Sequence, residues 1–206
     1  LALPFGVSAE YNSDRDHSWG RNASFQLACI HRLAEDLIEG ARALGEPVPP
    51  SWRHVLSKLP KACLEGEKGR ERIALWEGQV LEESHRHHSH LAALHPLDVI
   101  DAADPAWRDV VRRTADEWVL RGTGSWCSFS FPWAAMLCAR LDWPDAAAHM
   151  LACWQRQYVN EGHGTVGFTR YPGVTIERYT ANTAFVTDGR EIMQLDGGMG
   201  FVAALY

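Results

Sequence analysis

The sequence has no apolar run that approaches the roughly 18–20 residues needed for a transmembrane helix. Basic residues are also too few for a nucleic-acid or anionic-membrane surface, since 20 Lys and Arg stand against 26 Asp and Glu, for a net charge of −6. The opening segment 1–5 has neither the basic flank nor the length of a signal peptide. These absences predict that neither a nucleic acid nor a membrane is the main partner.

Cysteine is sparse, with five residues, an odd number, and no CxxC pair that would suggest a zinc site. Cys29, Cys138 and Cys153 fall within helical apolar patterns, so we expect buried thiols. An initiator Met is also lacking, and the chain stops at 201–206 within a helical pattern. We therefore expect a piece of a longer protein, truncated at both ends, and we leave the cellular compartment open.

The alternating pattern of β-strands is almost absent, and helical periodicity dominates. The helix over 24–44 is the clearest, because Ser24 or Asn22 can cap its start and Gly45 can end it. The expected helices cover 24–44, 51–59, 105–121, 131–141 and 145–158, and another opens after 198. Between them we expect long loops at 61–84 and 160–195. The second loop has several β-branched residues, which would suit a short hairpin. This rhythm predicts an all-α fold of helical hairpins.

Five of the ten histidines lie in the twelve residues 85–96, which we call the histidine block. The block would bind a metal, bind a ligand, or form a buried polar network. The spacing of His87 with His90, or of His85 with His88, suits zinc, but no HExxH glutamate lies between them. If the block is helical, His87 shares a face with Leu91 and Leu94, which would bury some imidazoles.

Two carboxylates lie in loops beside helices. Glu10 follows apolar residues that favour its protonated form, which suits a general acid. Asp196 precedes a helix, whose N-terminus favours an ionised carboxylate suited to a base or an orienting group. The chain has 26 acidic residues, so an alternative without catalysis stays open: Glu10 would be a surface loop residue, and Asp196 would only cap a helix.

Nine tryptophans are many for 206 residues. Trp107 and Trp118 fall on the apolar stripe of one expected helix and are assigned to the core. Trp19 and Trp126 lie in expected loops, where a flat ring with one polar edge suits the face of a sugar.

Three segments, in the same order along the chain, resemble the motifs of glycoside hydrolase family 95, the inverting α-L-fucosidases. HRHHSHL at 85–91 is similar to the family's HRHxSHL motif. VSAEYN at 7–12 resembles its SPEN segment, whose glutamate is the general acid. QLDGGMG at 194–200 resembles QIDGNFG, whose aspartate belongs to the base machinery. The resemblance spans nearly the whole chain.

The resemblance implies an incomplete (α/α)6 toroid over residues 1–206, with its loops gathered at one end around a sugar pocket. Glu10 would protonate the leaving glycosidic oxygen, and Asp196 would polarise an asparagine that activates water. Arg86 and His87 would hydrogen-bond the sugar, with His85 and Trp126 as further contacts. No metal or organic cofactor is expected. The substrate would be a terminal α-L-fucoside or α-L-galactoside.

The sequence departs from the family at Ala9, where the family has proline, and at Gly198-Met199, where it has Asn-Phe. The family's activating asparagines lie upstream of the acid, and only nine residues precede Glu10. We therefore expect a fragment that is inactive without the missing N- and C-terminal parts of the same enzyme. Two alternatives stay open: a non-catalytic carbohydrate-binding toroid, and a zinc-dependent hydrolase that uses the block from His85 to His95.

Overall fold

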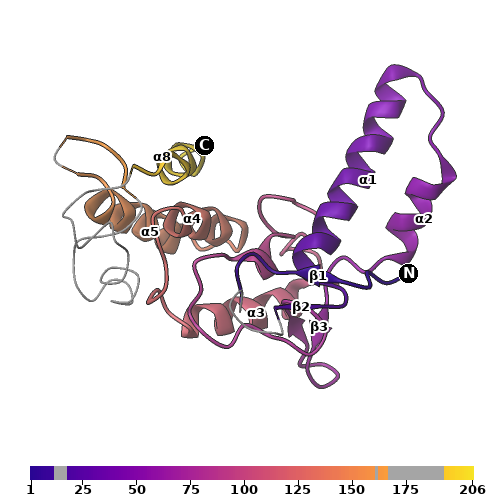
Figure 1. Ribbon diagram of the computed structural model, residues 1–206, viewed down its shortest axis with the longest axis horizontal. Coiled ribbons are helices and arrows are strands. Elements are labelled where there is room, and N and C mark those ends of the chain that lie inside the picture. Colours follow the sequence, from indigo (N-terminus) through magenta and orange to yellow (C-terminus); the bar gives the residue numbers. More distant parts are fainter. Residues whose placement is uncertain (12–17, 161, 167–192) are drawn as a thin grey trace. The chain divides into compact units, whose positions relative to one another are not determined.

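The computed structural model describes residues 1–11, 18–160, 162–166 and 193–206 (Figure 1). The chain forms two units, which we call unit 1 (Leu1–Leu81 and Ser89–Glu117) and unit 2 (Glu82–His88 and Trp118–Tyr206). Helices dominate both units, which confirms the helical class. Short strands are present as well, so the fold is not purely α-helical.

In unit 1, α1 (Ser24–Leu44) and α2 (Pro50–Lys58) pack together as a helical hairpin, as the periodicity predicts (Figure 1). Gly45 ends α1 in the left-handed conformation, with φ of 72°, and its N–H donates to the Arg42 carbonyl at 3.2 Å. A residue without Cβ adopts this φ without a steric penalty, which is why the helix stops there.

The predicted N-cap of α1 is wrong. The cap residue is Ala23, and no side chain caps the helix. The Ser24 hydroxyl instead donates to the Ala74 carbonyl at 2.6 Å and accepts the Cys63 N–H at 2.9 Å. The Ser24 side chain, which local capping rules predict at the start of α1, is therefore used in tertiary hydrogen bonds instead.

Unit 1 also contains two antiparallel pairs of two-residue strands (Figure 1). The strands are β1 (Gly6–Val7), β2 (Trp19–Gly20), β3 (Leu64–Glu65) and β4 (Arg72–Ile73). β1 pairs with β2, and β3 pairs with β4. The β3–β4 pair lies within 61–84, which we expected to be irregular. Strands of two residues are too short to show an alternating pattern, so the sequence gives no signal for them.

Helix α3 (Arg108–Leu120) begins later than the Asp104-Pro105 pair predicts. Asp104 caps a turn before the helix: its carboxylate accepts the Ala106 N–H, and its carbonyl accepts the N–H groups of Trp107 and Arg108. The predicted end is confirmed, because Gly122, with φ of 66°, follows the last helical residues.

Within unit 1, α3 holds the β3–β4 pair through a buried threonine. The Thr114 hydroxyl accepts the Ile73 N–H at 2.9 Å and donates to the Val110 carbonyl at 2.7 Å. Arg113 Nε donates to the Glu71 carbonyl at 2.9 Å beside it. The polar backbone of a short strand is thereby satisfied inside the core.

In unit 2, α4 (Ser130–Arg140) and α5 (Pro144–Gln157) form the hairpin predicted around residues 142–144 (Figure 1). Asp142 reverses the chain with φ of 59°, and the Trp143 N–H donates to the Cys138 carbonyl at 2.9 Å. Helix α8 (Leu195–Ala203) packs on α4, and it begins before the Asp196-Gly197-Gly198 segment that we expected to precede it. The expected loop 160–195 lies largely outside the described residues.

The five cysteines are all free. Cys138 is buried as predicted, whereas Cys29 and Cys153 are only half-buried. In the described ranges, no helix combines the length and apolar character needed to cross a membrane.

Candidate active site

Glu10 lies in a tight turn directly after β1. The turn is closed by the Tyr11 N–H, which donates to the Ser8 carbonyl at 3.4 Å, and Glu10 occupies the third position with φ of 54°. That position usually holds glycine or asparagine, because a Cβ is disfavoured at positive φ. Glu10 is exposed, whereas its neighbours Ser8 and Tyr11 are 3% and 2% exposed. The turn therefore anchors both sides of a carboxylate and presents it outward.

The Glu10 turn is bonded to the histidine block within unit 1. The hydroxyls of Ser8 and Ser89 form a short hydrogen bond, and both residues are buried. The Tyr11 ring also packs edge-on against Trp76, with 6.0 Å between ring centroids. Two of the three family-like motifs thus meet through Ser8 and Ser89, although 81 positions separate them in the sequence.

The histidine block is not an α-helix. Its only helical element is the single 3-10 turn η1 (Ser89–Leu91), and residues 91–94 that follow are buried. The helical face that would unite His87, Leu91 and Leu94 therefore does not form. The chain passes from unit 2 to unit 1 between His88 and Ser89.

His88 belongs to a buried polar network in unit 2. Its side chain is 0% exposed, its Nδ1 accepts the Trp118 indole N–H at 3.2 Å, and its Nε2 lies 3.0 Å from the Ser130 carbonyl. Because Nδ1 is an acceptor, Nε2 carries the proton and donates it to that carbonyl. Both ring nitrogens are engaged, so His88 matches the predicted histidine core and offers no free nitrogen to a zinc ion.

Three candidate sugar contacts precede His88. His85 is 7% exposed, while Arg86 and His87 are half-buried. The His87 ring lies between His85 and Phe129, with centroid distances of 5.4 and 5.1 Å. The Arg86 carbonyl accepts the Ser130 hydroxyl at 2.8 Å, which fixes the backbone that presents its guanidinium. Ser130 thus supports Arg86 and His88 together, a role that no local sequence signal indicates.

The two loop tryptophans have contrasting surroundings. Trp126 is 4% exposed and stacks on Trp118, at 5.6 Å between ring centroids and an interplanar angle of 19°. It also packs against His88 at 4.6 Å, so its ring belongs to the aromatic core of unit 2. Trp19 is 51% exposed and meets only the edge of Phe5 among the described ring pairs. Trp19 therefore has more of the free ring surface that sugar stacking requires.

Asp196 lies in the first turn of α8, with Gln194 as the cap residue. The carboxylate is exposed, and its Oδ1 accepts the N–H of Gly197 at 2.8 Å. The base or orienting role expected of Asp196 stays a prediction.

Gly197 allows α8 to lie directly on a buried serine. A Cβ built on Gly197 would lie 2.1 Å from Ser128 Oγ, and that hydroxyl accepts the Trp154 indole N–H at 2.9 Å. Phe201, one turn further along α8, stacks on Trp154 with centroids 4.7 Å apart. The position of Asp196 in unit 2 therefore depends on the absence of a side chain at the next residue.

Arg86 and Asp196 act on the same buried thiol. Burial raises the pKa of Cys127 to about 11; the Arg86 charge lowers it, and the Asp196 charge raises it. Charges influence a pKa in this way only from nearby. The charges of two predicted site residues, 110 positions apart in sequence, therefore act in opposite directions on the pKa of one buried thiol in unit 2.

In the part of the chain that the structure describes, no group of three or more His, Cys, Asp and Glu side chains is placed to hold a metal ion. Glu10 is described in unit 1, and Arg86, His87 and Asp196 are described in unit 2.

The three ordered motifs and the predominantly helical units fit the catalytic domain of a glycoside hydrolase, and the comparison with protein families identifies it. The model of the glycosyl hydrolase family 95 catalytic domain matches residues 4–206, and the chain belongs to this family. The search of curated proteins gave no match.

Proposed function

We propose that this chain carries catalytic residues of an inverting glycosidase that removes terminal α-L-fucosyl or α-L-galactosyl groups. The observation that carries the proposal is the family match over 4–206. The Glu10, Arg86 and Asp196 segments support it, because each resembles a family motif and they follow one another in the same order. The Ser8–Ser89 hydrogen bond supports it, because that bond joins the acid segment to the histidine block.

In the proposed reaction, Glu10 donates a proton to the glycosidic oxygen as the bond to the anomeric carbon breaks. Asp196 accepts a hydrogen bond from an asparagine amide, and the amide oxygen orients the attacking water on the opposite sugar face. As the water oxygen bonds to the anomeric carbon, the amide oxygen takes the water proton and the amide N–H proton passes to Asp196. Arg86 and His87 donate hydrogen bonds to sugar hydroxyls, and His85 supports the His87 ring. Inversion requires a water between the acid and the base, because the water attacks the anomeric carbon on the face opposite the leaving oxygen.

We also propose that residues 1–206 form part of an (α/α)6 toroid whose loops surround the sugar. The hairpins α1–α2 and α4–α5 support this arrangement, since such a toroid is built from helical hairpins.

The test is hydrolysis of aryl α-L-fucosides and α-L-galactosides by the longest polypeptide that carries this sequence. Glu10→Gln should lower kcat/KM by roughly 10²–10⁴-fold, the range over which general acid catalysis acts. Asp196→Asn should lower kcat similarly, while proton NMR of the wild-type reaction should show the β-anomer appearing first.

Matched charge removals at exposed sites, Glu67→Gln and Asp116→Asn, should leave the rates unchanged. Full turnover by Glu10→Gln would contradict the acid assignment, and an α-anomer as the first product would contradict inversion. The ratio of fucoside to galactoside turnover decides the substrate, because the two sugars differ by one oxygen at C6.

A non-catalytic carbohydrate-binding toroid is the second candidate. Ala9 and Gly198-Met199 support it, because they replace the family residues beside each carboxylate. Sugar binding without any hydrolysis would favour this role. A zinc-dependent hydrolase would instead show stoichiometric zinc and activity lost to a chelator, and the engaged ring nitrogens of His88 argue against a zinc pair of His85 with His88.

A further inference from the structure

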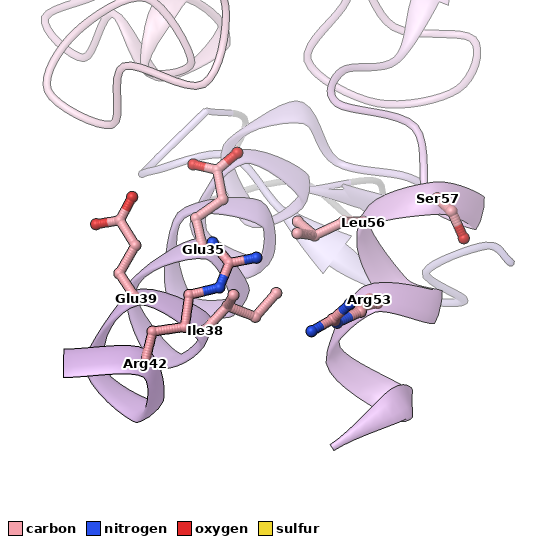
Figure 2. Close-up of a pocket in the computed structure, with 7 residues that line it drawn as sticks. All are labelled: Glu35, Ile38, Glu39, Arg42, Arg53, Leu56 and Ser57. Atoms are coloured by element: carbon pink, nitrogen blue, oxygen red, sulfur yellow. The ribbon is translucent and has the colours of Figure 1, made fainter. Parts of the chain in front are cut away.

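The helical hairpin of unit 1 contains a cavity of about 410 Å³ between α1 and α2 (Figure 2). Its size lies within the range of roughly 300–1,000 Å³ typical of small-molecule sites. Its floor is apolar: Ile38 of α1 is 6% exposed, and Leu56 of α2 is half-buried opposite it. The cavity is therefore a candidate site for a ligand with one apolar face.

The rim of this cavity carries two cations and two anions. Glu35, Glu39 and Arg42 come from α1, and Arg53 comes from α2. Figure 2 shows the Arg42 guanidinium beside Ile38 on α1 and the Arg53 guanidinium reaching from α2 toward the Ile38 side chain. The formal charges of the four side chains cancel, so the cavity offers hydrogen-bond donors and acceptors without a net charge.

Most of these rim groups are uncommitted. Glu35 lies 3.4 Å from Arg32, which is outside the cavity. Within the described residues, Glu39, Arg42 and Arg53 form no side-chain hydrogen bond or salt bridge. Arg42 and Arg53 can therefore engage a ligand without first breaking a side-chain hydrogen bond or salt bridge, whereas Glu35 and Glu39 also interact electrostatically with Arg32.

The charge balance selects the class of ligand. An anion would be attracted by the two guanidinium groups but repelled by the two carboxylates. A cation would be attracted by the carboxylates and repelled by the guanidinium groups. A neutral polyhydroxyl molecule gains from both sets, because each hydroxyl donates to a carboxylate and accepts from a guanidinium. Its C–H face fits the apolar floor.

We infer that the α1–α2 cavity binds a neutral sugar unit through Arg42, Arg53, Glu35 and Glu39 over the Ile38–Leu56 floor. The cavity is open and has no aromatic platform, so the affinity is weak, with Kd on the order of 1–10 mM. The inference does not depend on the roles proposed for Glu10 and Asp196.

The test compares three hexoses of one shape, namely galactose, galactosamine and galacturonate, by NMR titration of the ¹⁵N-labelled chain. Galactose should shift the backbone amides of residues 35–42 and 53–57 saturably, and the two charged sugars should bind more weakly. Arg42→Met or Arg53→Met, which keep an apolar stem, should weaken galactose binding roughly tenfold. Lys58→Met removes the same charge from α2 outside the cavity and should bind as the wild type does.

Tighter binding of galacturonate than of galactose would overturn the inference in favour of an anion site. It would also be overturned if no saturable shift appeared up to about 100 mM sugar, or if the arginine variants bound like Lys58→Met. The amide spectra themselves report whether each variant is folded. Because the signals come from α1 and α2, failure here leaves the hydrolysis test untouched, and failure of the hydrolysis test leaves this one untouched.

Discussion

Replacing Gly197 with alanine should destabilise unit 2 and displace Asp196. The new Cβ would lie 2.1 Å from Ser128 Oγ and 3.1 Å from Trp154 Nε1, well inside ordinary contact distance. Ser128 is 0% exposed, and turning its hydroxyl away would break the 2.9 Å hydrogen bond from Trp154. Either α8 moves outward or this hydrogen bond is lost.

The size of the effect follows from three contributions. Overpacking of a filled core costs about 1–3 kcal/mol, and loss of the indole hydrogen bond costs about 1 kcal/mol. Alanine regains about 1 kcal/mol over glycine within a helix. We therefore expect a net loss of about 1–3 kcal/mol in the free energy of unfolding, or about 2–4 °C in Tm for each kcal/mol in a chain of this size.

Urea unfolding followed by circular dichroism measures the change, and Gly40→Ala is the matched control. Gly40 also lies in a helix, but a Cβ there meets nothing within 4 Å, so this variant should be more stable by about 0.5–1 kcal/mol. Adding Ser128→Ala to Gly197→Ala removes the clashing oxygen, and the two changes should cost less together than the sum of their separate effects. A Gly197→Ala variant as stable as wild type, or strict additivity with Ser128→Ala, would refute the packing argument.

Two further predictions concern the interior. Thr114→Val keeps the shape of the side chain but leaves the buried Ile73 N–H without its 2.9 Å acceptor, so urea unfolding should show a loss of about 1–3 kcal/mol. Burial raises the pKa of the Cys127 and Cys138 thiols from 9.0 to about 11, so the native state holds their protons more tightly than the unfolded state does. The free energy of unfolding should therefore fall as the pH rises from about 9 to about 11.

Each of these predictions has its own control. Thr123→Val lies outside the Ile73 contact and should change stability by no more than about 0.5 kcal/mol; an equal loss in both variants would mean that the Ile73 bond is not the cause. Replacing Cys138 with alanine should flatten the alkaline fall in stability. An unchanged slope would show that burial of this thiol does not produce it.

Local rules predict the helices and the order of the motifs. Apolar spacing predicts where α1 begins, and Gly45 predicts where it ends. Pro144 predicts the start of α5 after the turn that follows α4. These signals act within a few residues. Local sequence rules did not predict the two-residue strands or the late start of α3. Their hydrogen bonds depend on partners such as Thr114, which is 41 positions from Ile73.

For the candidate site as well, some features can be predicted from the sequence and others depend on tertiary contacts. The sequence alone is enough to select Glu10, Arg86 and Asp196 as candidate site residues, because their segments resemble family motifs and follow one another in the same order. It leaves open whether the histidine block is a metal site, a ligand surface or a core. For His88, tertiary contacts decide the matter, since Trp118 and Ser130 lie 30 and 42 positions away and occupy both ring nitrogens.

The sequence by itself determined the helical class and the family. Helical periodicity and each motif depend on residues close together in the chain, and the order of the motifs can be seen without a structure. Only the tertiary structure decided that Ser8 meets Ser89, that Trp126 packs inside an aromatic core, and that Gly197 must lack a side chain. The physical reason is that close packing and the satisfaction of buried polar groups depend on residues that meet in space, whatever their separation along the chain.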